Sequence, residues 1–142
     1  MRAGGLSILL GAVLLVLAAC GSDNSRGISH GQDLANGRTI FINGTGDPTK
    51  PACGSCHTLA AAGTTGTAGP NLDDAFRGAR GQGFKASTFE QVVREQIAIP
   101  GIGLGMPANL VTGSDAADVA FFVARCAANL KDPQCQPQGA GG

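Results

Sequence analysis

The sequence predicts an all-α fold of three to four helices. Three segments of the 142-residue chain carry apolar residues at helical spacing, and each begins near a residue that favours a helix start. Aromatic residues are few, with six Phe and neither Trp nor Tyr, so a core made only of these side chains would be thin. The formal charge is zero and there is no basic run, which gives no reason to expect nucleic-acid binding.

The first predicted helix spans residues 30–43 and follows a capping box that begins at Ser29. The second spans residues 87–98, where Ser87 begins the same pattern. The third begins after Ser114, a residue type that commonly caps helices. The residues expected to face inward are Leu34, Gly37, Ile40 and Phe41 in the first helix, Phe89, Val92, Val93 and Ile97 in the second, and Val119, Phe122, Val123, Cys126 and Leu130 in the third.

Between the first two predicted helices lies the motif Cys53-Gly54-Ser55-Cys56-His57. Two cysteines separated by two residues and followed directly by histidine are typical of a c-type haem attachment site. The thiols of Cys53 and Cys56 would add to the two vinyl groups of the porphyrin, and His57 would be the proximal iron ligand. A buried porphyrin would also supply the apolar bulk that the aromatic-poor core lacks.

The cysteine pair has two alternative interpretations. A thioredoxin-like redox pair would follow a strand, whereas residues 46–51, just before the motif, are typical of a loop. A structural zinc site would need two further ligands at suitable spacing, and His30, Cys126 and Cys135 form no second pair of that kind. The haem interpretation is therefore favoured.

Residues 58–68 are rich in Ala, Gly and Thr and are expected to form an irregular loop that leads to Gly69-Pro70-Asn71-Leu72. Alone, this tetrapeptide predicts only a turn. Following the cysteine–histidine motif, it makes residues 30–130 resemble class I cytochromes c. The resemblance implies the class I cytochrome c fold, with three to four helices wrapped around one covalently bound haem c. It also implies that the Pro70 carbonyl accepts a hydrogen bond from His57 Nδ1–H.

Residues 101–108 are apolar but interrupted by Gly and Pro, so they are expected to form a loop that lies against another surface. This loop contains Met106, the only methionine besides the initiator. Its Gly-Met-Pro sequence resembles the distal-ligand motif of the same family. The resemblance implies that the Met106 thioether binds iron opposite His57 and raises the reduction potential. The alternative is a core methionine that fills a gap.

Residues 1–19 combine Arg2, an apolar run and small residues at its end, as an export signal does. Leu17-Ala18-Ala19-Cys20 resembles the lipobox of bacterial lipoproteins, which implies cleavage before Cys20 and lipidation of that cysteine. Residues 20–29 would then form a flexible tether that keeps the protein close to the bilayer. The alternatives are an ordinary signal peptide with an incidental cysteine, and an uncleaved anchor.

Two of the five cysteines, Cys126 and Cys135, are not used by the lipid and haem motifs. An even pair in an exported chain indicates a disulfide, with two free thiols as the alternative. Closing this loop of about ten residues would stabilise the fold by about 2.5–3 kcal/mol on the chain-entropy estimate. The bond would tie the C-terminal tail, residues 132–142, to the haem domain of residues 30–131.

We expect a one-electron carrier without catalytic residues that passes electrons between membrane-bound redox proteins. Its iron, with both axial positions occupied, would change oxidation state without binding a substrate. One alternative is a cytochrome subunit that acts only within a larger oxidoreductase or oxidase complex. Another is a haem enzyme or gas-binding protein with a labile sixth ligand. The export signal and the lipid would hold the protein on the cell membrane, facing the periplasm or the cell exterior.

Overall fold

The computed structural model describes residues 30–103 and 105–138. The predicted signal peptide, Cys20, the tether and the capping residue Ser29 lie outside the described residues. The described chain is predominantly helical, as predicted, and none of its helices is long and apolar enough to cross a bilayer. Its elements are α1 (His30–Asn43), α2 (Cys53–Cys56), β1 (Thr58–Leu59), η1 (Ala60–Ala62), β2 (Thr64–Thr65), α3 (Leu72–Gly81), α4 (Ala86–Ala98), α5 (Gly113–Cys126) and η2 (Pro133–Cys135).

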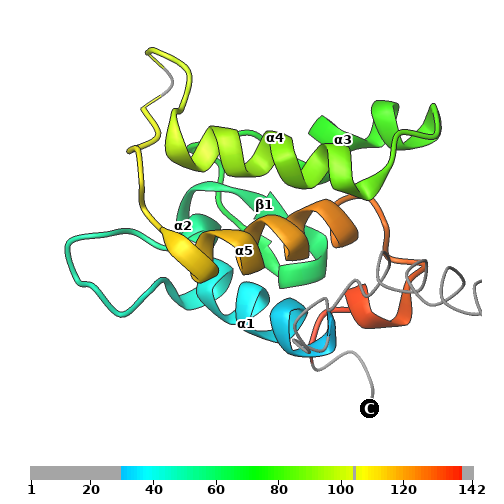
Figure 1. The fold of residues 1–142 in the computed structure, drawn as a ribbon, viewed down its shortest axis with the longest axis horizontal. Coiled ribbons are helices and arrows are strands. Elements are labelled where there is room, and N and C mark those ends of the chain that lie inside the picture. The colour runs from blue at the N-terminus through cyan, green and yellow to red at the C-terminus, as the bar shows by residue number, and fades with distance from the viewer. Residues whose placement is uncertain (1–29, 104, 139–142) are drawn as a thin grey trace, which may run out of the picture.

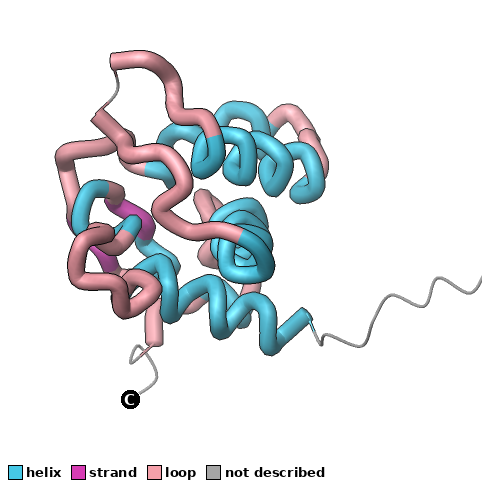
Figure 2. Tube along the Cα trace, turned by 60° about the vertical axis from the view of Figure 1, so that its left-hand side comes forward, coloured by secondary structure: helices cyan, strands magenta, loops and turns pink. Residues whose placement is uncertain are grey.

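Helix α5 lies in the middle of the domain, with α1 on one side and α3 and α4 on the other (Figure 1). The strand pair, α2 and much of the loop structure gather on one side of these helices (Figure 2). The core forms where α5 meets its neighbours, because α5 carries buried apolar residues on more than one face. The largest fully buried side chains are Phe41, Phe122, Leu59, Val119, Val123, Cys126 and Cys135.

Most of the predicted inward residues are buried, but two predictions are wrong. Val92 is 42% exposed and Leu130 is 41% exposed. Helix α4 turns the row formed by Phe89, Val93 and Ile97 toward the interior, and Val92 lies at the edge of this row. Leu130 is exposed because α5 ends at Cys126, so the helical spacing no longer applies to it.

Two predicted helix caps are also wrong. Helix α4 begins one residue before Ser87, and its N-cap, Lys85, makes no side-chain capping bond. Helix α5 begins at Gly113, one residue before Ser114, and its N-cap also lacks a side-chain capping bond. Both helices bury an apolar face against the core, and such packing supplies most of the stability of a helix in a protein.

The predicted loop of residues 58–68 is in fact a small antiparallel hairpin, in which Thr58 pairs with Thr65 and Leu59 with Thr64. Side-chain hydrogen bonds stabilise this hairpin in addition to the backbone hydrogen bonds between its strands. The Thr64 hydroxyl donates to the carbonyl of His57 at 2.9 Å and accepts from the amide of Leu59 at 3.1 Å. Strands of two residues are too short to show an alternating pattern, so no signal for them is present in the sequence.

Helices α1 and α5 cross at Gly37, where a Cβ atom would overlap the carbonyl oxygen of Asp118. The absence of a side chain therefore allows the two backbones to touch. Next to this contact, Phe41 and Phe122 pack edge to face with ring centroids 5.9 Å apart, a favourable arrangement for aromatic pairs. The buried position of Gly37 confirms the prediction that this residue faces inward.

A disulfide between Cys126 and Cys135, both fully buried, ties the C-terminal segment back to the end of α5. A hydrogen bond links η2 to α1 as well, because the Gln134 carbonyl accepts from the Arg38 guanidinium at 2.7 Å. An ion pair between Arg125 and Asp132 at 2.9 Å closes the same turn. The tail as far as Cys135 thus belongs to the folded domain.

The crossing of α1 and α5 yields a stability prediction. Gly37→Ala is expected to lower the free energy of unfolding by about 1–3 kcal/mol, because its Cβ forces the two helices apart. Urea unfolding followed by circular dichroism measures the change.

Gly78→Ala in α3 is the matched control, because a Cβ there meets nothing within 4 Å. It should raise the free energy of unfolding by about 0.5–1 kcal/mol through helix propensity. Equal effects of the two substitutions would contradict the close crossing.

Candidate functional site

The cysteine pair lies on α2, a single helical turn that ends directly at His57. The amide of His57 donates to the carbonyl of Cys53 at 3.0 Å, which closes the turn. Both thiols, of Cys53 and Cys56, are half-buried and unpaired. Burial raises the pKa of the Cys53 thiol above its usual value. The turn therefore carries two thiols and an imidazole within five consecutive residues.

His57 Nδ1 lies 2.8 Å from the carbonyl oxygen of Pro70. A carbonyl oxygen can only accept, so Nδ1 must carry the proton and Nε2 is the nitrogen left to bind a metal. The ring is confined as well, because a Cβ atom on Gly69 would lie 2.5 Å from His57 Cε1. The amide of Gly69 donates to the carbonyl of Cys56 at 2.8 Å, which holds the two segments together beside the ring.

Helix α3 positions Pro70 by beginning shortly after it. The Asn71 side chain accepts hydrogen bonds from the amides of Asp73 and Asp74 at 2.9 and 3.4 Å, and so caps α3. Neither α2 nor α3 was predicted from the sequence. The signal for α3 was present, since an asparagine closely followed by two acidic residues is a common helix start.

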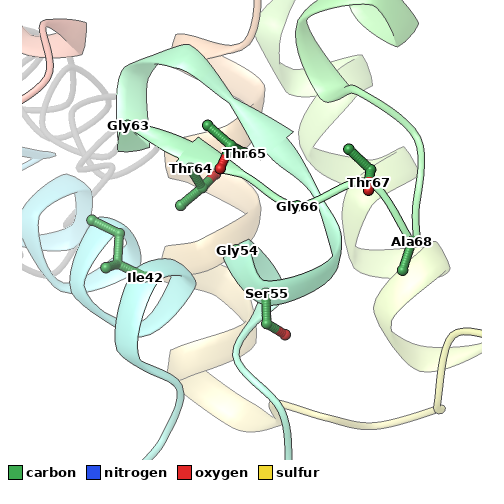
Figure 3. A pocket seen from close by; sticks show the side chains of 9 residues that line it. All are labelled: Ile42, Gly54, Ser55, Gly63, Thr64, Thr65, Gly66, Thr67 and Ala68. Atoms are coloured by element: carbon green, nitrogen blue, oxygen red, sulfur yellow. The ribbon is translucent and has the colours of Figure 1, made fainter.

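The small size of Gly54 has a packing role. A Cβ atom at this position would lie 2.5 Å from Thr64 Cγ2, so the β2 segment packs directly on α2. On this side the chain forms an open hollow (Figure 3), lined by Ile42, Gly54, Ser55 and residues 63–68. The hydroxyls of Ser55 and Thr64 already bond to backbone carbonyls, and no lining residue is titratable. The hollow therefore presents no acid–base chemistry.

Met106 is half-buried and packs against the hydrophobic core. The loop that carries it is fastened at Asn109, whose amide donates to the carbonyl of Ile97 in α4 at 2.8 Å. The Asn109 carbonyl accepts from Lys50 Nζ at 3.3 Å, which links the Met106 loop to the loop before α2. Upstream of Met106, Ile99 is 81% exposed and Ile102 is fully exposed, so this part of the loop presents apolar surface to solvent.

The side chains present fit a covalently bound haem better than the alternatives. The disulfide removes Cys126 and Cys135 as zinc ligands, and no cluster of three or more His, Cys, Asp or Glu occurs among the described residues. Both described strands follow α2 rather than precede it, unlike the strand of a thioredoxin-like motif. Two free thiols, one imidazole with a defined tautomer and one thioether are the groups that c-type haem uses.

The contact between Gly69 and the His57 ring gives a direct test of the site. Gly69→Ala is expected to displace the imidazole and lower the stability of the haem-loaded protein by about 1–3 kcal/mol. Urea unfolding monitored by the haem absorption measures the loss. Ala68→Ser, at the exposed neighbouring position, should leave both stability and spectrum unchanged. An unaltered Gly69→Ala protein would show that the ring is not confined there.

A scan against protein-family models and a search of the curated proteins found no match. Among solved structures, the chain is similar to the c-type cytochrome SorU from Sinorhizobium meliloti, with 34% sequence identity and a TM-score of 0.50. The match covers 68% of this chain and 92% of that one. Because this identity extends over almost the whole of the solved structure, the chain belongs to the c-type cytochromes. This membership implies haem c as its cofactor.

Proposed function

We propose that the protein is a mono-haem, class I electron carrier. A single haem c would be attached through Cys53 and Cys56, with His57 and Met106 as the axial iron ligands. The observation that carries this proposal is the 2.8 Å contact between His57 Nδ1 and the Pro70 carbonyl, directly after the turn with the two thiols. When bound, the haem supplies the one-electron couple.

The residues of the chain orient the ligand and tune its basicity. The Pro70 carbonyl accepts the Nδ1 proton, which directs Nε2 toward the iron position and makes the imidazole a stronger electron donor. A thioether as the opposite ligand has the reverse effect on the couple, because it raises the reduction potential. The pair His57 and Met106 would therefore hold the potential in the range of an electron carrier.

Electron transfer is favoured over catalysis by the composition of the Met106 loop. Residues 101–108 contain no titratable side chain. Cleavage of peroxide needs a positioned acid or base on the distal side, and this loop supplies none. With Met106 bound, the sixth position would also be closed to substrates.

Protein-film voltammetry of the mature, haem-loaded protein tests the proposal. We expect one reversible one-electron wave that is unchanged when peroxide or oxygen is added. A catalytic current on addition of either would instead assign the protein to the haem enzymes.

The distal ligand is tested by Met106→Ala. We expect a lower reduction potential and a ferrous form that binds carbon monoxide, because the sixth position is open. Ile102→Ala, which removes an exposed apolar side chain from the same loop, should preserve the potential and exclude carbon monoxide. A Met106→Ala protein with the wild-type potential and no carbon monoxide complex would contradict ligation by Met106.

We further propose that the protein is an exported lipoprotein that meets membrane-bound redox partners. The proposal is supported by the sequence around Leu17-Ala18-Ala19-Cys20 and by the short stretch of residues between Cys20 and α1. A tether of about nine residues has a root-mean-square reach of only about 15–18 Å. The haem domain would thus stay close to the bilayer.

Cys20→Ser tests the anchor. The substitution removes the lipid attachment point, so most of the haem-loaded protein is expected to move from the membrane fraction to the soluble fraction. Immunoblots of the two fractions measure the distribution, with Ser22→Ala as the control that stays on the membrane. Membrane retention of a processed Cys20→Ser protein would contradict lipid anchoring.

A further inference from the structure

We propose that Asp73 is a positioning residue that holds the Pro70 carbonyl against His57 and thereby sets the reduction potential. This inference rests on the proposed ligation of haem iron by His57. The Asp73 carboxylate bonds to backbone amides rather than to the imidazole or the cysteines. It acts through the two backbone segments that it joins to α3.

The Asp73 carboxylate is buried, with 8% of the residue exposed, and it makes two short hydrogen bonds to backbone amides. Oδ2 accepts from the amide of Ala60 at 2.7 Å, and Oδ1 accepts from the amide of Ala128 at 2.7 Å. Amide bonds to a charged acceptor are stronger than those between neutral groups. A single side chain therefore joins η1, α3 and the residues that follow α5.

The bond between Asp73 and Ala60 lies the same number of residues after both partners of the histidine contact. Ala60 is three residues after His57, and Asp73 is three residues after Pro70. On the other side of the contact, the amide of Gly69 bonds to the Cys56 carbonyl at 2.8 Å. The contact between His57 and Pro70 thus has a hydrogen bond between the same two segments on either side of it. Asp73 makes the one on the α3 side.

The bond to Ala128 anchors this arrangement to the centre of the fold. Ala128 has a positive φ of 54°, a backbone conformation that residues with a Cβ adopt rarely. From the same helix as Asp73, Arg80 donates to the carbonyls of Ala124 and Ala127 at 2.6 and 2.9 Å. Asp73 and Arg80 therefore tie α3, the helix that begins two residues after Pro70, to the end of α5.

The direction of the effect on the potential follows from the histidine. A strong Nδ1–H bond to the Pro70 carbonyl raises the basicity of the ligand and favours the ferric state. Loosening the Pro70 segment weakens that bond, so the reduction potential should rise.

The test compares Asp73→Asn with Asp74→Asn in the full-length, haem-loaded protein. The two substitutions remove the same charge from adjacent residues, but the Asp74 side chain is exposed and pairs with the exposed Arg77. In Asp73→Asn, the new side-chain amide keeps one acceptor oxygen and turns an N–H group toward the second backbone amide, which breaks one of the two bonds. The measured quantities are the reduction potential and the exchange rate of the His57 Nδ1 proton by NMR.

We expect Asp73→Asn to have a higher potential than Asp74→Asn and a faster exchange of the His57 Nδ1 proton. Equal potentials and equal exchange in the two variants would overturn the inference. Loss of stability alone, without either change, would also overturn it, since that is the result of a purely structural role. A wild-type protein whose haem lacks histidine ligation would instead contradict the proposed function.

If Asp73→Asn does not fold, hydrogen exchange in the wild-type protein tests whether Asp73 positions the Pro70 carbonyl. One opening event should expose the amides of Ala60 and Ala128 together with the His57 Nδ1 proton, so the three should share one opening free energy. Opening of His57 while both amides stay protected would overturn the inference.

Discussion

The backbone carbonyl of Pro70 fixes which nitrogen of His57 carries a proton. Because the carbonyl can only accept, it selects the tautomer with a free Nε2. Much of the nearby chain maintains this one contact. The α2 turn places His57, Gly69 leaves room for its ring, and the Asn71 cap starts α3 close to Pro70. A one-electron couple needs little more from the protein than fixed ligands.

The rest of the fold compensates for a core of small side chains. Gly37 lets α1 and α5 touch, which gains contact without large residues. Polar side chains then join the elements that apolar packing alone would hold weakly. The Arg80 guanidinium donates hydrogen bonds to backbone carbonyls where α5 ends, and it also lies over the Phe89 ring, 5.0 Å from the ring centroid. The disulfide fixes the same region of α5, so the helix is held along its length and at its end.

The long amphipathic helices could be predicted from the sequence, and the cysteine–histidine motif could be identified in it, because apolar spacing and the C-x-x-C-H pattern are local signals. Through the family resemblance, the sequence also led us to expect the hydrogen bond between the Pro70 carbonyl and His57. The helix starts at Ser87 and Ser114 were wrong because packing, rather than a cap, determines where α4 and α5 begin. The hairpin was missed because its strands are two residues long. The role of Asp73 depends on Ala60 and Ala128, and no local pattern indicates contacts this distant.

The visible absorption spectrum of the purified mature protein tests ligation by His57 and Met106 most directly. It should be recorded in the ferric state and then, after reduction, with and without carbon monoxide. We expect a weak long-wavelength band in the ferric form, which marks sulfur-to-iron charge transfer, and no response of the ferrous form to carbon monoxide. Absence of that band together with a carbon monoxide shift would show that Met106 does not hold the sixth position.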